Sequence, residues 1–406
     1  MDRTIMANTF QTDRSYFAIF LIFLRLGLTS FGGPIAHLGY FRDEFVVRRK
    51  WLSDPSYADL VAFCQFLPGP ASSQVGIALG LSRSGYGGAL AAWMGFTLPS
   101  ASVLIIFALG IARYDDAVTT GVLYGLKVVA VAVVAQAVWG MGRNLCPDAP
   151  RISIMAAATC FVLYVPSALG QAGAISIAAI IGMLLLKPLQ REFHEPLHIN
   201  VQRSAGLFWL ALFFTLLLGL PLLANLFPSQ TLSTIDAFYR SGSLVFGGGH
   251  VVMPLLQSEV VSSGWVNNDT FLAGYGAAQA VPGPLLSFSA FLGASMNQAP
   301  TGWLGGVICL VAIFAPSFLL VVGALPFWER LRGTPHTQAA LLGVNAAVVG
   351  LLLAALYQPV WTSAIRAPQD FGLALVALIA LMFWKLPPWL VVLGGGVLGW
   401  LLNIAL

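Results

Sequence analysis

Charged residues are scarce in this sequence. Only 9% of the 406 residues are charged, 58% are hydrophobic, and the mean hydropathy is +0.83. An ordinary soluble domain carries roughly 25% charged residues, so this composition excludes one and predicts an all-α polytopic membrane protein whose partner is the lipid bilayer. The net charge of +4 is small, and we interpret it as positive-inside bias, with no nucleic acid as a partner.

The sequence also has few cysteines and lacks several well-known catalytic and metal-binding motifs. The four cysteines, Cys64, Cys146, Cys160 and Cys309, stand singly without the spacing of a metal site or a redox pair. No Walker A loop, HExxH motif or zinc-finger spacing occurs. The sequence therefore predicts no metal, no cofactor and no ATP hydrolysis, and it predicts that the chain is not an enzyme.

What the chain does contain is an internal repeat. The stretch "FLRLGLTSFGG" aligns with "FYRSGSLVFGG" at an offset of 215 residues, which pairs Arg25 with Arg240. Downstream, "CQFLPGP" aligns with "AQAVPGP", and "GLKVVAVAVVAQAVW" aligns with "GVNAAVVGLLLAALY". We infer two homologous halves, 15–187 and 235–406, and domain limits of 1–195 and 196–406 with an extra helix at 204–226.

Each half opens with two apolar segments that are interrupted by a Gly-rich break and by Pro-Gly-Pro. Such breaks are tolerated at membrane depth only where the backbone is buried in protein or lines a cavity. We therefore expect these four segments to be re-entrant. Nine other helices are expected to cross, near 88–112, 121–141, 152–166, 168–187, 204–226, 302–326, 338–360, 371–384 and 387–404.

The basic residues orient this arrangement. With a cytoplasmic N-terminus, 15 of the 20 Lys and Arg lie in cytoplasmic segments, whereas only Arg113 and Arg366 lie outside. Five crossings then separate equivalent parts of the halves, and because five is odd the second half is inverted. The C-terminus is placed outside. Inverted repeats with broken helices are typical of secondary transporters, whose substrate site lies at the repeat interface.

Three cations fall inside apolar segments. Arg25, Arg240 and Lys127 each need an anionic partner or an aqueous cavity, because an ionised Arg costs roughly 2.5 kcal/mol or more in hydrocarbon. One interpretation is contact with an anionic substrate. The alternative is that each arginine pairs with a structural carboxylate or reaches an interface. For Lys127, whose repeat partner is Asn345, the sequence leaves both possibilities open.

The breaks supply donors for the same kind of ligand. Helices that begin after Pro-Gly-Pro direct N–H groups and a positive dipole end toward the centre, glycines let backbone approach a ligand, and serine hydroxyls add donors. We expect this set to bind a tetrahedral oxyanion. The candidates are Gly32, Gly33, Pro68, Gly69, Pro70, Ser72, Gly247, Gly248, Pro282, Gly283, Pro284 and Ser287.

Four titratable residues are candidates for proton coupling. Glu44 and Glu259 are matched in the repeat, while His37 and His250 each follow a Gly-rich break. A solvated loop or helix-end position is the alternative for each of them.

These motifs resemble those of the chromate transporters of the CHR family, in its long-chain form with two domains. The residues that match the family's motifs are Arg25, Gly27, Phe31, Gly32, Gly33, Pro34, His37, Glu44, Trp51, Gln65, Pro68, Gly69 and Pro70 in the first half. In the second half they are Arg240, Gly242, Phe246, Gly247, Gly248, Gly249, Pro254, Glu259, Trp265, Gln279, Pro282, Gly283 and Pro284.

The resemblance implies secondary active export of chromate from the cytoplasm across the bacterial inner membrane, giving chromate resistance, with sulfate as a competing anion. A homodimer is a further expectation. The alternatives are inward transport of sulfate or another oxyanion, an anion channel, and a membrane-embedded chromate reductase, against which the lack of paired cysteines and cofactor motifs argues.

Overall fold

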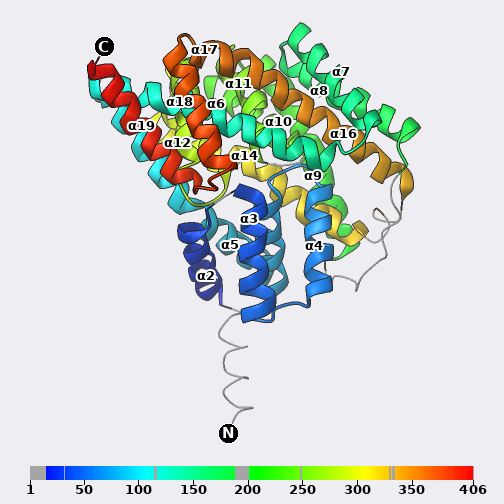
Figure 1. Ribbon diagram of the computed structural model, residues 1–406. Coiled ribbons are helices and arrows are strands. Elements are labelled where there is room, and N and C mark those ends of the chain that lie inside the picture. Colours follow the sequence, from blue (N-terminus) through cyan, green and yellow to red (C-terminus); the bar gives the residue numbers. More distant parts are fainter. Residues whose placement is uncertain are drawn as a thin grey trace.

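The computed structural model describes residues 15–31, 33–113, 117–187, 201–246, 249–328, 331 and 334–405. Helices make up all of the regular structure within these ranges, and no strand occurs among them. They pack into a bundle in which α2, α3, α4 and α5 occupy one end (Figure 1). The predicted all-α membrane architecture is confirmed.

The first Gly-rich break turns the chain back on itself. Helices α2 (Tyr16–Thr29) and α3 (Gly33–Arg42) flank it, and Gly33 has a φ of 77°. The ring of Phe23 lies 5.7 Å from that of Phe41, although 18 residues of continuous helix would separate them by about 27 Å. The two helices therefore form a hairpin. The π-helix η1 (Asp43–Arg48) and α4 (Asp54–Phe66) follow.

A second fold-back follows Pro-Gly-Pro. Helix α5 (Ala71–Arg113) begins directly after Pro70, as predicted, but Ser84 and Gly85 have non-helical backbone angles. Gly80 and Gly88 are in backbone contact, whereas eight residues of straight helix span about 12 Å. The segment 71–83 thus returns toward the side from which α4 came, and only 86–113 continues across the molecule.

The second half repeats this pattern. An ion pair joins Arg240 on α10 to Glu259 on α11 across the second break, and the backbones of Gly293 and Gly305 touch where α13 folds against α14. The elements are α10 (Gln230–Ser243), η2 (Gly249–Val251), α11 (Val252–Val260), α12 (Asn268–Ala278), η3 (Leu285–Ser287), α13 (Phe288–Ala294), α14 (Gly302–Ala324) and η4 (Leu325–Phe327).

Each of the nine segments expected to cross coincides with a helix. Five helices, α5, α6, α9, α14 and α16, are long and apolar enough to span a membrane. Four are shorter, with 15–18 residues, or about 22–27 Å against a hydrocarbon core of roughly 30 Å. The bounds are α6 (Ala117–Leu145), α7 (Ala149–Tyr164), α8 (Ala168–Leu185), α9 (Arg203–Leu226), α16 (Pro335–Ala355), η5 (Leu356–Trp361), α17 (Thr362–Ala364), α18 (Pro368–Met382) and α19 (Pro388–Ala405).

The halves interlock through their long helices. Helix α6 of the first half packs against α18 and α19 of the second, and α16 of the second half packs against α7 and α8 of the first. Glycines permit the close approach: Gly125 meets Gly395 and Gly399, while Gly343 meets the backbone of Ala178 and Gly182. The unmatched helix α9 lies against α10 and α14.

Helices α6 and α18 run alongside each other in the same direction. The Tyr124 hydroxyl donates to the Asp370 carboxylate, and farther along both helices Gln136 Nε2 donates to the carbonyl of Leu381 over 3.4 Å. Asp370 also accepts from the backbone N–H of Arg366, 2.8 Å away, just after α17. The C-terminal end of α16 and its extension therefore lies at the N-terminal end of α6.

Candidate functional site

The four discontinuities meet at the centre of the molecule through two reciprocal hydrogen bonds. The N–H of Gly69, in the first Pro-Gly-Pro, donates to the carbonyl of Val245 at the second break over 2.6 Å. The N–H of Gly283, in the second Pro-Gly-Pro, donates to the carbonyl of Ser30 at the first break over 3.1 Å. Both donors and both acceptors are repeat-related pairs. Each half therefore binds the break of the other with its own Pro-Gly-Pro.

Only glycine fits at these two positions. The φ angles are 128° at Gly69 and 112° at Gly283, which L side chains rarely adopt. A Cβ at Gly69 would lie 2.6 Å from Ser317 Oγ, and one at Gly283 would lie 2.9 Å from Ser100 Oγ. Ser100 and Ser317 are themselves matched in the repeat. The symmetry of the junction thus extends to the helices behind it.

A cavity of about 520 Å³ lies at this junction, within the range of small-molecule sites. It is bounded by both breaks, the second Pro-Gly-Pro, the C-terminal part of α6 and the start of α19. The polar side chains among its described lining residues are neutral or histidine. They are Ser30, His37, Gln65, Gln136, Asn144, His250 and Gln279.

Both histidines of the cavity are held by hydrogen bonds. His37 is 1% exposed; its Nε2 donates to the carbonyl of Ser30 over 3.2 Å, so in the neutral ring Nδ1 accepts from Ser72 Oγ at 3.5 Å. His250 Nδ1 lies 2.7 Å from the hydroxyl of Tyr275. The contact with Ser72 therefore helps to orient the ring of His37. Ser72 is not among the residues that line the cavity.

Two donors at the cavity have no partner among the described residues. They are the hydroxyl of Ser30, a residue with no exposed surface, and the amide Nε2 of Gln279. Buried polar atoms are nearly always hydrogen-bonded, so an unpaired one calls for water or a ligand. Both groups belong to lining residues of the central cavity. They mark the position where an acceptor would complete the site.

Arg25 lies elsewhere. No Lys or Arg is among the described residues that line the cavity, and Arg25 is exposed on α2. Gly27 packs directly on the backbone of Gly95 and Phe96 in α5, and two helical positions correspond to about 200° of rotation. Arg25 is therefore turned away from α5, and the structure does not bring it together with Arg240 at one binding site.

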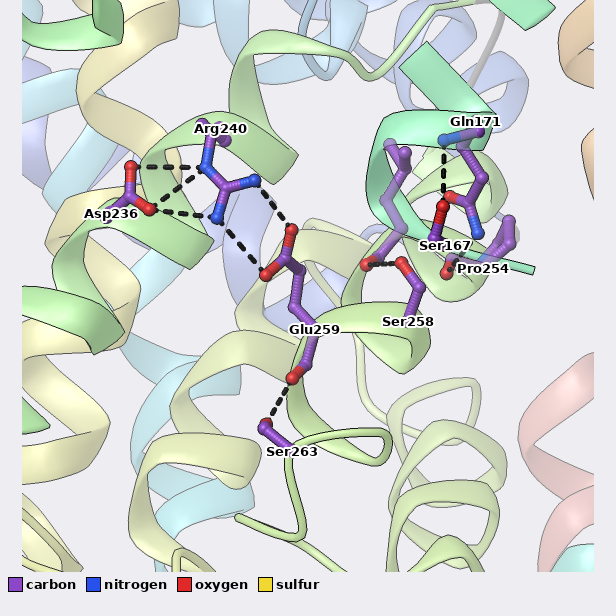
Figure 2. A network of polar contacts seen from close by, with 10 residues as sticks. Ser167, Gln171, Asp236, Arg240, Pro254, Ser258, Glu259 and Ser263 are labelled. Atoms are coloured by element: carbon purple, nitrogen blue, oxygen red, sulfur yellow. Dashed lines mark hydrogen bonds and ion pairs between the residues drawn. The ribbon is translucent and has the colours of Figure 1, made fainter. Parts of the chain in front are cut away.

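Arg240 is paired inside its own half. It forms ion pairs of 2.8 Å with Asp236 and 2.9 Å with Glu259, and the Glu259 carbonyl accepts from Ser263 (Figure 2). The side chains are 28%, 8% and 16% exposed for Arg240, Asp236 and Glu259. Arg240 therefore has the carboxylate partners that the alternative interpretation of the sequence expects.

Glu44 has different partners from its repeat mate Glu259. It pairs with Arg49 at 2.6 Å and with Arg48 at 3.1 Å in the basic loop. Burial opposes ionisation of Glu44, but the hydrogen bonds and charges of Arg49 and Arg48 outweigh it and lower the pKa of the carboxyl. Neither glutamate lines the central cavity.

Lys127 is likewise paired. Its ammonium donates to the Asp269 carboxylate over 3.0 Å, with the Lys127 side chain 11% exposed and that of Asp269 61% exposed. This pair ties α6 to the start of α12. Lys127 is not among the described residues that line the central cavity.

The predicted site residues other than the charged ones divide into four groups. Gly33, Gly283, His37 and His250 line the cavity. Ser72 and Ser287 form hydrogen bonds within the protein: Ser72 Oγ contacts His37, and Ser287 Oγ donates to the carbonyl of Pro284. The N–H groups of Gly69 and Gly283 donate to backbone carbonyls of the opposite break. Gly32, Gly247 and Gly248 lie outside the described residues. The described prolines of the two motifs, Pro68, Pro70, Pro282 and Pro284, shape the turns without lining the cavity.

Sequence reasoning missed most of the amide groups. Gln136 and Asn144 lie on one face of α6 and carry no motif signal. Gln65 and Gln279 were matched in the repeat, three residues before each Pro-Gly-Pro, and that duplication was the signal that could have identified them.

Duplicated sets of discontinuous helices around a cavity at the interface of the two repeats are typical of secondary transporters. The comparison with known families is consistent with that class. The sequence model of the chromate transporter family matches twice, over residues 17–224 and 232–400. The chain belongs to the chromate transporter family.

Curated relatives agree. The chain is 28% identical to a chromate transport protein of Pseudomonas aeruginosa, over 95% of this chain and 92% of the relative. It is 30% identical to a probable chromate transport protein of Synechococcus elongatus (90% and 88%) and 26% identical to a chromate transport protein of Cupriavidus metallidurans (98% and 96%). No solved structure matches the chain.

Proposed function

We propose that this protein exports chromate from the cytoplasm across the bacterial inner membrane by secondary active transport, and so confers chromate resistance. Membership of the chromate transporter family and the names of the three relatives support the substrate. The central cavity between the two halves supports the mode of transport, because a site at a repeat interface can be exposed to either side by rocking of the halves.

Chromate binds in this proposal to neutral donors. The observation that carries it is the pair of buried, unpartnered donors at the cavity, Ser30 Oγ and Gln279 Nε2. Helix α3 begins at the cavity-lining Gly33, so the positive end of its dipole adds to the field at the site. A site of neutral donors without a fixed cation holds a dianion less tightly, which suits a carrier that must release it.

The proposed topology has a cytoplasmic N-terminus, an external C-terminus and an inverted second half. The cavity extends along α6 to the exposed Asn144, next to the basic residues Arg143 and Arg151 that the positive-inside rule assigns to the cytoplasm. The cavity would then face the cytoplasm, ready to load. His37 and His250 remain the coupling candidates at the cavity, and a homodimer remains a prediction.

The test is chromate uptake into inverted vesicles, with and without a proton gradient, by the variants Ser30→Ala and Gln279→Ala. A hydrogen bond to a charged group contributes about 1.5–3 kcal/mol, so we expect each variant to weaken apparent affinity by about tenfold or more. Ser73→Ala is the matched control, because its buried hydroxyl is also unpaired but does not line the cavity. Unchanged affinity in both cavity variants would overturn the site. Sulfate added in excess measures selectivity.

A further inference from the structure

A second cavity, of about 300 Å³, lies between α7, α8, α11 and the end of α16. It shares no described lining residue with the central cavity. Its polar side chains are those of Gln171, Gln257, Ser258, Ser262, Asn268 and Gln358, two of which are visible in Figure 2 as part of the contacts around Pro254. No step described so far uses this space.

The two cavities are lined by the same face of repeat-related helices. One face of α6 lines the central cavity with Val133, Gln136, Ala137 and Gly140. The corresponding residues of α16 and η5, in the same order, line the second cavity: Leu351, Ala354, Ala355 and Gln358. Four consecutive matches on one helical face indicate that the second cavity is the repeat counterpart of part of the first.

The two cavities open at opposite ends of α6. The central cavity includes the exposed Gly140 and Asn144 at the C-terminal end of α6. The mouth of the second cavity is at the exposed Gln358, beyond the end of α16, which lies at the N-terminal end of α6. Asn268, at the same mouth, precedes the Asp269 that binds Lys127.

One buried turn of the chain lies between lining residues of the two cavities. His250 lines the central cavity and Pro254 lines the second, four residues apart, or about 6 Å of helix. Between them, Val251, Val252 and Met253 are 0% exposed. This turn directly follows the second Gly-rich break.

At the end of the turn that borders the second cavity, a hydrogen bond links Pro254 to α8. Gln171 Nε2 donates to the carbonyl of Pro254 over 3.2 Å (Figure 2), and the amide oxygen of Gln171, on a residue 5% exposed, has no partner among the described residues. An unpaired acceptor fits water and disfavours a bare anion. The second cavity is thus suited to a hydrated ion in passage.

We infer that the second cavity is the exit vestibule of the transport path, on the side of the membrane opposite the central cavity, and that the turn 251–253 is the barrier between them. The inference rests on the proposed function. Movement of this turn joins the cavities and lets the oxyanion rehydrate as it leaves.

The test uses single cysteines in a background from which the four native cysteines are removed. Ala137→Cys reports the central cavity, Ala354→Cys and Gln358→Cys report the vestibule, and Leu222→Cys, exposed on α9, is the lipid-facing control. A charged, membrane-impermeant thiol reagent is applied to right-side-out and to inverted vesicles, after chromate transport by each variant is verified. If Ala354→Cys is inactive, Leu351→Cys replaces it.

We expect Ala137→Cys to react in inverted vesicles and Gln358→Cys to react in right-side-out vesicles. Ala354→Cys, which is buried, should react from the right-side-out face several-fold faster during chromate transport. Reaction of Ala354→Cys and Gln358→Cys from the cytoplasmic face alone, or from neither face, would overturn the vestibule while leaving the proposed function intact. Failure of Ala137→Cys to react from the cytoplasmic face, even though transport continues, would instead refute the central cavity as the loading site.

Discussion

The repeat-related arginines give the sharpest prediction. Arg240→Ala leaves the carboxylates of Asp236 and Glu259, which are 8% and 16% exposed, without their counter-ion. Removing one partner of a buried pair costs about 3–5 kcal/mol. Because Arg240 itself is 28% exposed, we expect the lower end of that range. Arg25→Ala removes an exposed side chain, which typically changes stability by less than about 0.5 kcal/mol.

The assay is thermal unfolding of the purified protein in detergent, followed by the loss of the monodisperse peak in size-exclusion chromatography. Arg240→Ala should lower the midpoint by several degrees and Arg25→Ala should leave it nearly unchanged. The triple variant Arg240→Met, Asp236→Asn, Glu259→Gln removes all three charges of this cluster and should recover most of the loss. Equal midpoints for the two single variants would refute the reasoning. A stable triple variant without transport would show that the charges of this trio serve transport as well as stability.

Two further predictions concern the junction and the tie between α6 and α12. Gly283→Ala forces a φ of 112° on a residue with a Cβ, and that Cβ would lie 2.9 Å from Ser100 Oγ. We expect a loss of about 1–3 kcal/mol of folding stability and a large loss of chromate uptake. The control is Gly110→Ala, where nothing lies within 4 Å of the added Cβ; it should leave uptake unchanged and the melting midpoint unchanged or raised. Asp269→Ala leaves the buried Lys127 unpaired, whereas Lys127→Met leaves an exposed carboxylate in water. The melting midpoint should therefore fall more for Asp269→Ala, and the opposite order would contradict the assigned burial of the pair.

Each half supplies contacts that the other half needs, which explains why the junction is duplicated. Each Pro-Gly-Pro donates to the break of the other half, and each long helix packs on the terminal helices of the other half. Small side chains at Gly125 and Gly343 allow these contacts. A half on its own would leave these backbone groups and apolar faces uncovered, so we expect neither half to form the cavity alone.

The architecture could be predicted from the sequence because it depends on local signals. Apolar length, the Gly-rich and Pro-Gly-Pro breaks, and the basic loops act through hydration and backbone geometry, which are encoded residue by residue. The repeat located the pairs Gly69/Gly283 and Gln65/Gln279 and predicted that the two breaks matter. Each of the nine predicted crossing segments was found as a helix.

Tertiary structure alone decided which polar groups meet. Arg25 and Arg240 occupy matched positions and lie next to equally well packed glycines, yet Arg25 is exposed whereas Arg240 is paired, because Asp236 stands where the first half has Leu21. The neutral cavity depends on the packing of α6 against both breaks, and no local pattern specifies which helix faces will meet. The sequence by itself determined a duplicated membrane protein with broken helices; the fold determined that its central cavity is lined by amides, a hydroxyl and histidines, because Arg240 and Lys127 pair with carboxylates and Arg25 faces outward.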